Sequence, residues 1–449
     1  MLRPRRLGAL ILALLSCSYF QTSEAHDLSL IFNDAFKNDP TYQAAEANFN
    51  ALKETYPQAL AKVLPTLSLE ANAAASHSDI RGITGGSNNL ITLGGNSFGT
   101  NGYTVTLTQP LFNFNYFVQL KQADAQVKQA YANYLAAGQD LMVRTVRAYF
   151  DVLSAEDTKR FADANKDAID KQLGQAKARY QTGLETITAV YEAQSAYDTS
   201  VAEALSARND VDNAKEALRE LTGYAVEEVA PLDAHKFKLQ PPKPLGVEEW
   251  VVKATQQNLS LQAARFGMVA ARQQIKMNYA GHLPTLNVVT DYTKQNGNFF
   301  GSINYGQSDV GLQLSVPIYS GGQVSSQVRQ AKSQYIQAGD EVEKTYRHTF
   351  VSTRQLFNSV MTDVAKVKAD QQSVISHQST LKNTEAEYQA GTRTMVDVLT
   401  AIKNLYQAQQ TLSYDRYTYI VDTVLLKQEA GILSGEDIAE LNQWLLKSY

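Results

Sequence analysis

The chain repeats itself, and this internal repeat limits its possible folds more than any other feature. Residues 42–45 (YQAA) match 261–264 (LQAA), and residues 64–67 match 283–286, where both segments read LPTL; both pairs are 219 positions apart. Further along, 180–183 (YQTG) match 388–391 (YQAG) at an offset of 208. The offset changes where Gly/Asn/Ser-rich segments differ in length. The chain is therefore predicted to hold two copies of one unit.

The repeat sets the expected division of the chain. We expect residues 1–25 to be an export signal and residues 26–229 to form the first structural repeat, made of helix, β-hairpin, long helix and return helix. A proline-rich connector follows at 230–246, then the second structural repeat at 247–431 and a C-terminal segment at 432–449.

The N-terminus has the pattern of a cleaved export signal. Three arginines between residues 3 and 6 precede an apolar run from Leu7 to Leu15, and small residues lead to cleavage after Ala25. The run of about nine residues is too short to span a bilayer as a helix. One alternative stays open, because residues 14–17 resemble a lipoprotein cleavage box, which would place a lipid on Cys17 instead.

Composition excludes several classes of function. The formal net charge is −4, and removal of the signal with its three arginines and Glu24 would make it −6, so there is no basic surface for nucleic acid. The only cysteine lies in the signal, and no two histidines stand at metal-ligand spacing. No glycine-rich phosphate loop follows a predicted strand. The sequence therefore predicts no enzyme, no cofactor and no metal.

Proline placement predicts long helices. No proline lies between Pro110 and Pro231 or after Pro317, and both stretches are rich in Ala, Gln, Glu, Lys and Leu. Apolar residues in the second stretch recur at steps of three and four, as in a coiled-coil seam. These seam positions are Val328, Ala331, Tyr335, Ala338, Val342, Met395, Val398, Ile402, Leu405 and Leu412.

Each long stretch is interrupted once, by Gly183 in the first copy and Gly391 in the second, where glycine can end a helix in the left-handed conformation. A helix over 116–181 would be about 100 Å long and the helix after it only about 60 Å. We therefore expect a further helix in each repeat, at 28–62 and 247–281, to stack end to end on the shorter one.

Period-two alternation predicts one β-hairpin per repeat. Tyr103, Val105 and Leu107 alternate with threonines, and Leu312 and Leu314 alternate with Gly311 and Gln313. Weaker partners are expected at 67–77 and 286–295, with loops at 79–101 and 296–307. Strands of about ten residues match the thickness of a membrane, but four strands cannot close a barrel. Three chains would supply twelve.

Three motifs resemble one known family in the correct order. They are Gly281–Leu286 (GHLPTL), Pro317–Gly322 (PIYSGG) and Tyr388–Leu399 (YQAGTRTMVDVL). On these residues the chain resembles the TolC family of Gram-negative outer-membrane ducts over essentially its whole mature length. The resemblance implies a mixed fold in a homotrimer. A shared 12-stranded antiparallel outer-membrane β-barrel, with four strands per protomer, continues into a long periplasmic α-helical coiled-coil barrel, and the connector and residues 432–449 lie in an equatorial belt.

The family also implies a function and partners. The chain would be a passive exit duct for tripartite drug efflux and type I protein secretion, located in the cell outer membrane with a large periplasmic extension. It would open at its periplasmic tip on docking with a periplasmic adaptor (membrane fusion protein) and an inner-membrane RND, ABC or MFS pump. Its other partner would be outer-membrane lipid. The alternative is a periplasmic coiled-coil adaptor or scaffold, which would carry one hairpin per chain.

The family's periplasmic gate maps onto the second tip motif. Tyr388, Arg393 and Thr188 match three positions of a tyrosine and arginine lock, and Asp397 matches a ring of carboxylates that would favour cations. The tip turns at Gly183, Gly391 and Thr392 are implied to meet the adaptor. A solvated helix face remains the alternative reading of Arg393 and Asp397.

Two departures from the family alter this gate. Ala189 stands where the family has the aspartate that pairs with the arginine, and Thr400 stands where it has a second acidic ring. We therefore expect either that Arg393 bonds elsewhere, with Glu185 one turn earlier as the candidate, or that the gate is looser. We also expect weaker cation selectivity than in relatives with both acidic rings. The sequence does not reveal which pumps, drugs or secreted proteins the duct would serve, or its resting state.

Overall fold

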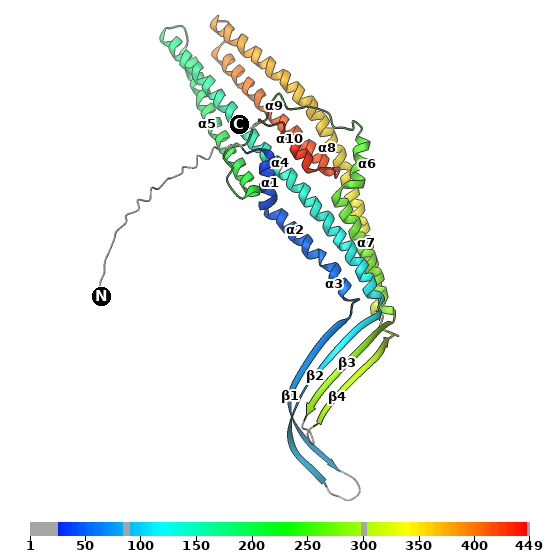
Figure 1. Cartoon of the computed structure of the whole chain (residues 1–449). Coiled ribbons are helices and arrows are strands. Elements are labelled where there is room, and N and C mark those ends of the chain that lie inside the picture. The colour runs from blue at the N-terminus through cyan, green and yellow to red at the C-terminus, as the bar shows by residue number, and fades with distance from the viewer. Residues whose placement is uncertain (1–25, 84–89, 298–302, 447–449) are drawn as a thin grey trace, which may run out of the picture.

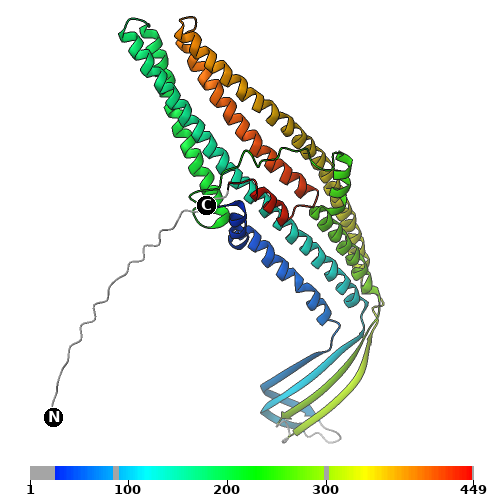
Figure 2. The same cartoon turned by 45° about the horizontal axis from the view of Figure 1, so that its top comes forward.

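The structure is a computed structural model that describes residues 26–83, 90–297 and 303–446. The predicted export signal with Cys17, and the last three residues of the C-terminal segment, lie outside these residues. The molecule is elongated, with helices along most of its length and one sheet at the far end, as both views show (Figures 1 and 2). Among the described helices none is long and apolar enough to cross a membrane.

Both halves of the chain have short helices, then two strands, then two long helices, and α10 has no counterpart in the first half. The first half consists of α1 (Leu28–Asn38), α2 (Pro40–Lys53), α3 (Thr55–Ala61), β1 (Thr66–Ile83), β2 (Leu90–Phe112), α4 (Phe114–Gln181) and α5 (Ile187–Thr222). The second half consists of α6 (Val247–Gln257), α7 (Leu259–Tyr279), η1 (Ala280–His282), β3 (Thr285–Gly297), β4 (Ile303–Ser315), α8 (Gln323–Gln389), α9 (Met395–Glu429) and α10 (Gly435–Asn442). The long helices predicted from proline placement are confirmed, with 68 residues in α4 and 67 in α8.

The early helix of each half is broken, which corrects the prediction of single helices over 28–62 and 247–281. Asp39 ends α1 and caps α2 by accepting a hydrogen bond from the Tyr42 amide at 2.8 Å. Asn258 does the same between α6 and α7, accepting from the Leu261 amide at 2.9 Å. Both residues have ψ near 120°, which no helical residue adopts. They occupy equivalent positions of the two repeats.

The predicted end-to-end stacking is confirmed, because each return helix ends against the break in the early helix. The Asn38 side-chain amide donates to the carbonyl of Thr222, the last residue of α5, at 2.7 Å. The Asn258 side-chain amide likewise donates to the carbonyl of Glu429, the last residue of α9, at 3.0 Å. These bonds satisfy carbonyls that the helix ends leave free. We call these two places the helix junctions.

The four strands form one antiparallel sheet in the order β1-β2-β3-β4. The strands are longer than the expected ten residues, and the predicted loops are wrong at 79–83, 90–101, 296–297 and 303–307, which are strand. The rest of each predicted loop, 84–89 and 298–302, lies outside the described residues. The β1/β2 ladder runs from Thr66 opposite Thr108 to Ile83 opposite Leu90. Polar and glycine residues extend these strands because cross-strand pairing satisfies their backbone, which outweighs their weak strand propensity.

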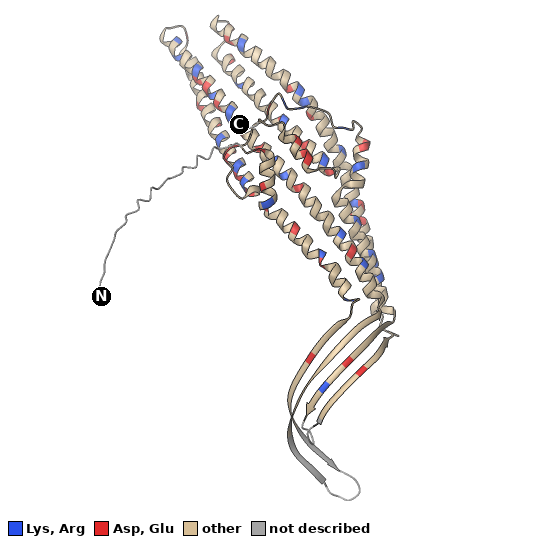
Figure 3. Ribbon diagram, viewed as in Figure 1, with Lys and Arg blue, Asp and Glu red and all other residues tan. Residues whose placement is uncertain are grey.

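The sheet has one apolar and one mostly polar face, since directly paired residues point to the same side. Across the four strands the apolar face carries Leu67, Leu69, Val105, Leu107, Val288, Tyr292, Val310, Leu312 and Leu314, and the other face carries Ser68, Glu70, Thr104, Thr106, Asp291, Thr293, Gln307 and Asp309. On the polar face, Thr106 donates to Asp291 at 2.6 Å. The apolar side chains are uncovered, with Leu67 72% and Val310 78% exposed. Charges are sparse on the described strands and dense on the helices (Figure 3).

The main core lies where the connector and the C-terminal segment wrap the long helices. The Tyr149 hydroxyl of α4 donates to the Ala230 carbonyl of the connector at 2.8 Å. The connector and the C-terminal segment pair with each other, because the Asp233 amide donates to the Trp444 carbonyl and the Leu446 amide to the Pro231 carbonyl. This core consists of residues from α1, α4, α5, α6, α8, α9 and α10, together with residues of the segments that follow α5, α9 and α10.

Candidate functional site

Both helical hairpins turn at the end of the molecule farthest from the sheet (Figure 1). Gly183 has φ of 72° and Gly391 has φ of 81°, so the predicted left-handed turns are confirmed. The two turns share one hydrogen-bond pattern. The Leu184 amide donates to the Arg179 carbonyl at 2.9 Å, and the Thr392 amide donates to the Glu387 carbonyl at the same distance. Gly183, Gly391 and Thr392 are all exposed.

An apolar cluster joins the two hairpins just behind these turns. It includes residues of α4, α5, α8 and α9, so the hairpins of one protomer pack against each other at the tip. Its buried members are Ile169, Leu173, Ala176, Ala189, Val190, Ala193, Tyr388, Met395, Val398, Leu399 and Ile402. Ala189, where the resemblance implies a missing aspartate, is buried in this cluster.

Tyr388 ties the second hairpin to the first. Its side chain is buried and its hydroxyl donates to Glu185 Oε2 at 2.9 Å. The Arg179 guanidinium lies over the tyrosine ring, 5.0 Å from its centroid, and 3.8 Å from the same Glu185 oxygen. Burial and the bond to the Glu185 carboxylate raise the pKa of Tyr388 to about 12, so the phenol remains a donor at neutral pH.

Arg393 bonds within its own turn, and the expectation that it pairs with Glu185 is wrong within the protomer. Its Nε donates to Glu387 Oε2 at 2.9 Å, and a terminal nitrogen lies 4.0 Å from Asp397 Oδ1. The physical reason is competition, because the Glu185 carboxylate already accepts from Tyr388 and faces Arg179. Arg393 itself is exposed.

Asp397 has a structural task besides its expected place in a ring. Its Oδ2 accepts from the Thr394 amide at 3.0 Å, and its own amide donates to the Thr394 hydroxyl at 3.3 Å, which together form a capping box at the start of α9. The backbone hydrogen bond from Thr394 lowers the pKa of Asp397, so this carboxylate is ionised at neutral pH. Thr188 is exposed in the first turn of α5, and the Thr400 hydroxyl donates to the Val396 carbonyl at 2.7 Å.

Arg179 and Glu387 were missed by the sequence reasoning. Each lies one residue before the repeated tyrosine motif, at Tyr180 and Tyr388. A basic residue in the last turn of α4 favours the helix C-terminus, and this was the available signal for Arg179.

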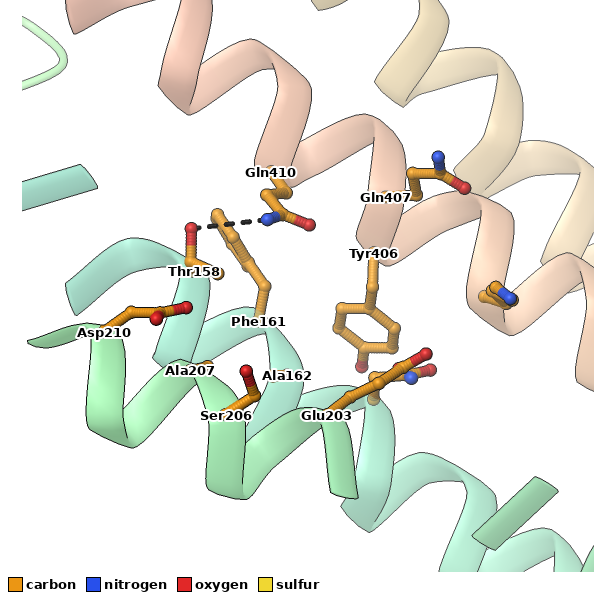
Figure 4. Close-up of a pocket in the computed structure, with 12 residues that line it drawn as sticks. Thr158, Phe161, Ala162, Glu203, Ser206, Ala207, Asp210, Tyr406, Gln407 and Gln410 are labelled. Atoms are coloured by element: carbon orange, nitrogen blue, oxygen red, sulfur yellow. Dashed lines mark hydrogen bonds between the residues drawn. The ribbon is translucent and has the colours of Figure 1, made fainter. Parts of the chain in front are cut away.

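A groove of about 430 Å³ separates the first hairpin from α9 (Figure 4). Figure 4 shows Tyr406 and Gln410 entering from α9 opposite Phe161 of α4 and Glu203 of α5. The Gln410 amide spans the groove to the Thr158 hydroxyl at 3.4 Å. Asn165 also lines this groove, and its buried Oδ1 has no hydrogen-bond partner among the described residues. A second hollow of about 410 Å³ shares Asn165 and continues toward the tip.

Metal chemistry has no support in the described part of the chain. Within residues 26–83, 90–297 and 303–446, no group of three or more His, Cys, Asp or Glu side chains could hold a metal ion.

Comparisons with known proteins agree with this architecture. The family described as "Outer membrane efflux protein" matches residues 31–224 and 250–431. The outer membrane protein TolC of Vibrio cholerae is 34% identical over 426 residues, which cover 94% of each chain. The protease secretion protein PrtF of Dickeya chrysanthemi is 28% identical over 98% of this chain and 95% of its own.

A solved structure supports the fold alone. The Campylobacter jejuni CmeC outer membrane channel superposes with a TM-score of 0.78 over 94% of this chain and 90% of that one, at 16% identity. The fold of nearly the whole chain therefore recurs in an outer-membrane channel. Together the family match and the full-length relatives show that this chain belongs to the outer membrane efflux protein family, as a TolC-like outer-membrane exit duct with a periplasmic helical extension.

Proposed function

We propose that three copies of this chain form one passive duct, with a 12-stranded barrel in the outer membrane and a helical barrel in the periplasm. The observation that carries the proposal is the two-faced sheet. Its apolar face is uncovered, and β1 and β4 are its edges in the described residues. An open edge is not tolerated in lipid. Because β1 and β4 are antiparallel, β4 of one protomer can pair with β1 of the next.

The proposed duct carries cargo supplied by partners. Efflux is the activity in the family's name, and secretion is the activity in the name of PrtF. We assign docking of a periplasmic adaptor, with its RND, ABC or MFS pump, to the exposed turns at Gly183, Gly391 and Thr392. The neighbouring groove, with Glu203 and Lys403 on opposite walls, would accept an adaptor helix. The duct itself performs no chemistry.

Assembly is tested by recovering the protein from bacterial cells. We expect it in the outer-membrane fraction, migrating as a trimer before heating and as a monomer afterwards. Recovery as a monomer from the periplasm would instead support an adaptor or scaffold and would overturn the proposal.

The proposed gate is the tip, where Tyr388, Glu185 and Arg179 hold the hairpins of a protomer together and Arg393 with Asp397 faces the constriction. Around a threefold axis, three copies of each charged side chain would form rings. The repeats at 26–229 and 247–431 would then move as two hairpins joined by the connector at 230–246.

Arg393→Ala is expected to give larger single-channel conductance in planar bilayers and stronger cation preference. The substitution removes the bond to Glu387 that braces the turn and deletes a positive charge beside Asp397. The matched control is Arg208→Ala, since Arg208 is exposed on α5 away from the tip. Parental conductance and selectivity in Arg393→Ala would show that the constriction lies elsewhere.

Asp397→Asn is expected to move selectivity in the opposite direction. Asparagine keeps an oxygen that can accept from Thr394, so the capping box survives while the charge is lost. A unit charge about 4 Å from an ion contributes about 1 kcal/mol in water, so the ratio of cation to anion permeability should fall about fivefold. Reversal potentials in a salt gradient measure this ratio, with the exposed Asp212→Asn as control. An unchanged ratio would remove Asp397 from the pore.

A further inference from the structure

Two pairs of carboxyl groups lie between α8 and α9, well behind the tip. Asp363 and Asp370 are seven residues apart on α8, and Asp415 and Asp422 are seven residues apart on α9. Seven residues are two helical turns, so each pair of aspartates lies on one side of its helix. Because the two helices form an antiparallel hairpin, Asp363 lies opposite Asp422 and Asp370 lies opposite Asp415, and the charges of Asp422 and Asp415 act on the Asp363 and Asp370 carboxyls.

Two carboxyl oxygens at this seam lack ordinary donors. Asp363 is only 6% exposed, and the buried Oδ2 atoms of Asp363 and Asp370 have no hydrogen-bond donor among the described residues. A carboxylate is an acceptor only, so two facing carboxylates cannot bond each other. When one of them is protonated, its O–H becomes the missing donor. A shared proton therefore satisfies a buried oxygen that is otherwise costly to leave unpaired.

Few positive charges offset these four carboxyls. Lys366, on α8 between the two pairs, faces Asp363, Asp370 and Asp422. On α4, Arg147 faces Asp422 and also Asp151, a further carboxyl on the same helix.

The other helices packed against the seam place their charges farther away. On α6, Glu248 accepts from Arg354 of α8, nine residues before Asp363. On α5, Asp210 lies in the groove beside Gln410, more than one helical turn from Asp415.

Burial and the neighbouring carboxyl act in the same direction. Burial first, and then the charge of Asp422, raise the pKa of Asp363 to about 6. Burial also raises the pKa of Asp422 and of Asp370. A metal ion is not the alternative occupant, since no described group of three such side chains could hold one. The chemistry thus favours a proton between the members of each pair.

We propose that Asp363 with Asp422, and Asp370 with Asp415, each share a proton and act as a pH-dependent clasp between α8 and α9. The sign follows from linkage, because the folded hairpin binds protons more tightly than the unfolded chain. The contribution is fully present below the ordinary aspartate value of about 4 and is lost as the pH rises through about 6. In mild acid the shared protons hold α8 and α9 together, and at neutral pH the facing carboxylates are charged and repel each other.

This clasp lies on the hairpin that carries Tyr388, Arg393 and Asp397. When α8 and α9 are held together, the tip of their hairpin can move less, so acid would hold the gate in one arrangement. This effect on the gate rests on the proposed function, whereas the proton sharing itself does not. The decisive test therefore measures the hairpin itself.

The test is hydrogen exchange of the intact, detergent-solubilised protein, followed by mass spectrometry of peptides that cover 356–373 and 410–425. After correction for intrinsic exchange rates, protection should rise about tenfold between about pH 7.5 and about pH 5, one decade for each pKa unit crossed below 6. The double variant Asp415→Asn with Asp422→Asn places an amide donor against each α8 carboxylate, so protection should be high and independent of pH. Asp340→Asn is the matched control, since Asp340 is exposed on the same helix.

An independent readout is the infrared carbonyl band of protonated carboxyl groups. It should titrate near pH 6 in the parent and in Asp340→Asn, about two units above an ordinary aspartate, and lose that component in the double variant. Protection that does not change with pH in the parent, or a pH response that persists in the double variant, would overturn the clasp. Neither measurement depends on conductance, so a failed channel assay and a failed clasp are distinguishable.

Discussion

Asp39→Ala is expected to lower the free energy of unfolding by about 3 kcal/mol, because it breaks a buried ion pair and a helix cap together. Asp39 is 2% exposed. Its carboxylate accepts hydrogen bonds from both terminal nitrogens of Arg144, at 3.1 and 2.8 Å, and from the Tyr42 amide. Losing one partner of a buried pair costs about 3–5 kcal/mol. We expect the lower end of this range because Arg144 still has an ion pair with Asp140, at 2.7 Å, in the variant. Urea unfolding of the purified protein in detergent measures the change.

The second repeat supplies the control for this variant. Asn258→Ala removes the equivalent cap and the bond to the Glu429 carbonyl, but no ion pair. We expect it to cost about 1–2 kcal/mol. Equal losses in the two variants would show that the Arg144 pair adds nothing to the junction.

Acid should weaken the Asp39 contact, opposite to its effect on the clasp. Burial raises the pKa of Asp39, but the hydrogen bonds and charge of Arg144 and the Tyr42 amide outweigh it, and the net shift is downward. A lowered pKa gives stability that is present above about pH 4 and is lost as the pH falls further. The parent should therefore lose stability relative to Asp39→Ala in strong acid. The same protein would have one contact strengthened by mild acid and another weakened by strong acid.

The predictable parts of the fold depend on local chemistry. The absence of proline from 111–230 allows α4 and α5, and glycine at 183 and 391 permits the left-handed turns that separate each pair of helices. Both signals act within a few residues of where they appear. The alternation at Tyr103, Val105 and Leu107 likewise predicts which side chains share a face of the sheet.

The parts that could not be predicted depend on pairing across the chain. The polar and glycine-rich residues 96–102 of β2 are strand because the neighbouring strand β1 satisfies their backbone, and their own strand propensity is weak. The breaks at Asp39 and Asn258 carry a local capping signal, which the sequence reasoning overlooked in favour of continuous helical composition.

The candidate site also has a part that local sequence predicts and a part that depends on contacts across the chain. The tip turns follow from the glycines, whereas the partner of Arg393 depends on which acceptor is already occupied. Glu185 is near enough in sequence to the family's missing aspartate to be a reasonable candidate, but Tyr388 reaches it from the other hairpin. Competition between two donors for one carboxylate is decided by packing of Tyr388 in the tip cluster, which sequence alone does not specify.

Gly431→Ala is expected to lower the free energy of unfolding by more than about 4 kcal/mol and so prevent stable folding. Losses of this size have few causes, and a steric clash inside the packed structure is one of them. Gly431 follows α9 with φ of 71°, and a Cβ there would lie 2.2 Å from the Gln257 carbonyl oxygen and 2.8 Å from the Asn258 amide nitrogen. Both neighbours are backbone at a helix junction, so no side chain can rotate away. Relief requires α9 to separate from α7, which breaks the Asn258 bond to Glu429.

Gly223→Ala separates the clash from the backbone strain. Gly223 stands at the equivalent position, with φ of 80°, but a Cβ there would meet only the Asn38 Cβ at 3.7 Å, an ordinary contact. Alanine in the left-handed region costs about 1–2 kcal/mol, so this variant should assemble with a modest loss. Trimer yield from outer membranes and urea unfolding in detergent compare the two. Equal trimer yields and equal unfolding free energies for the two variants would mean that the backbone at the Gly431 junction can shift without loss of stability. The tight contact at Gly431 would then not be what holds α9 in line with α7.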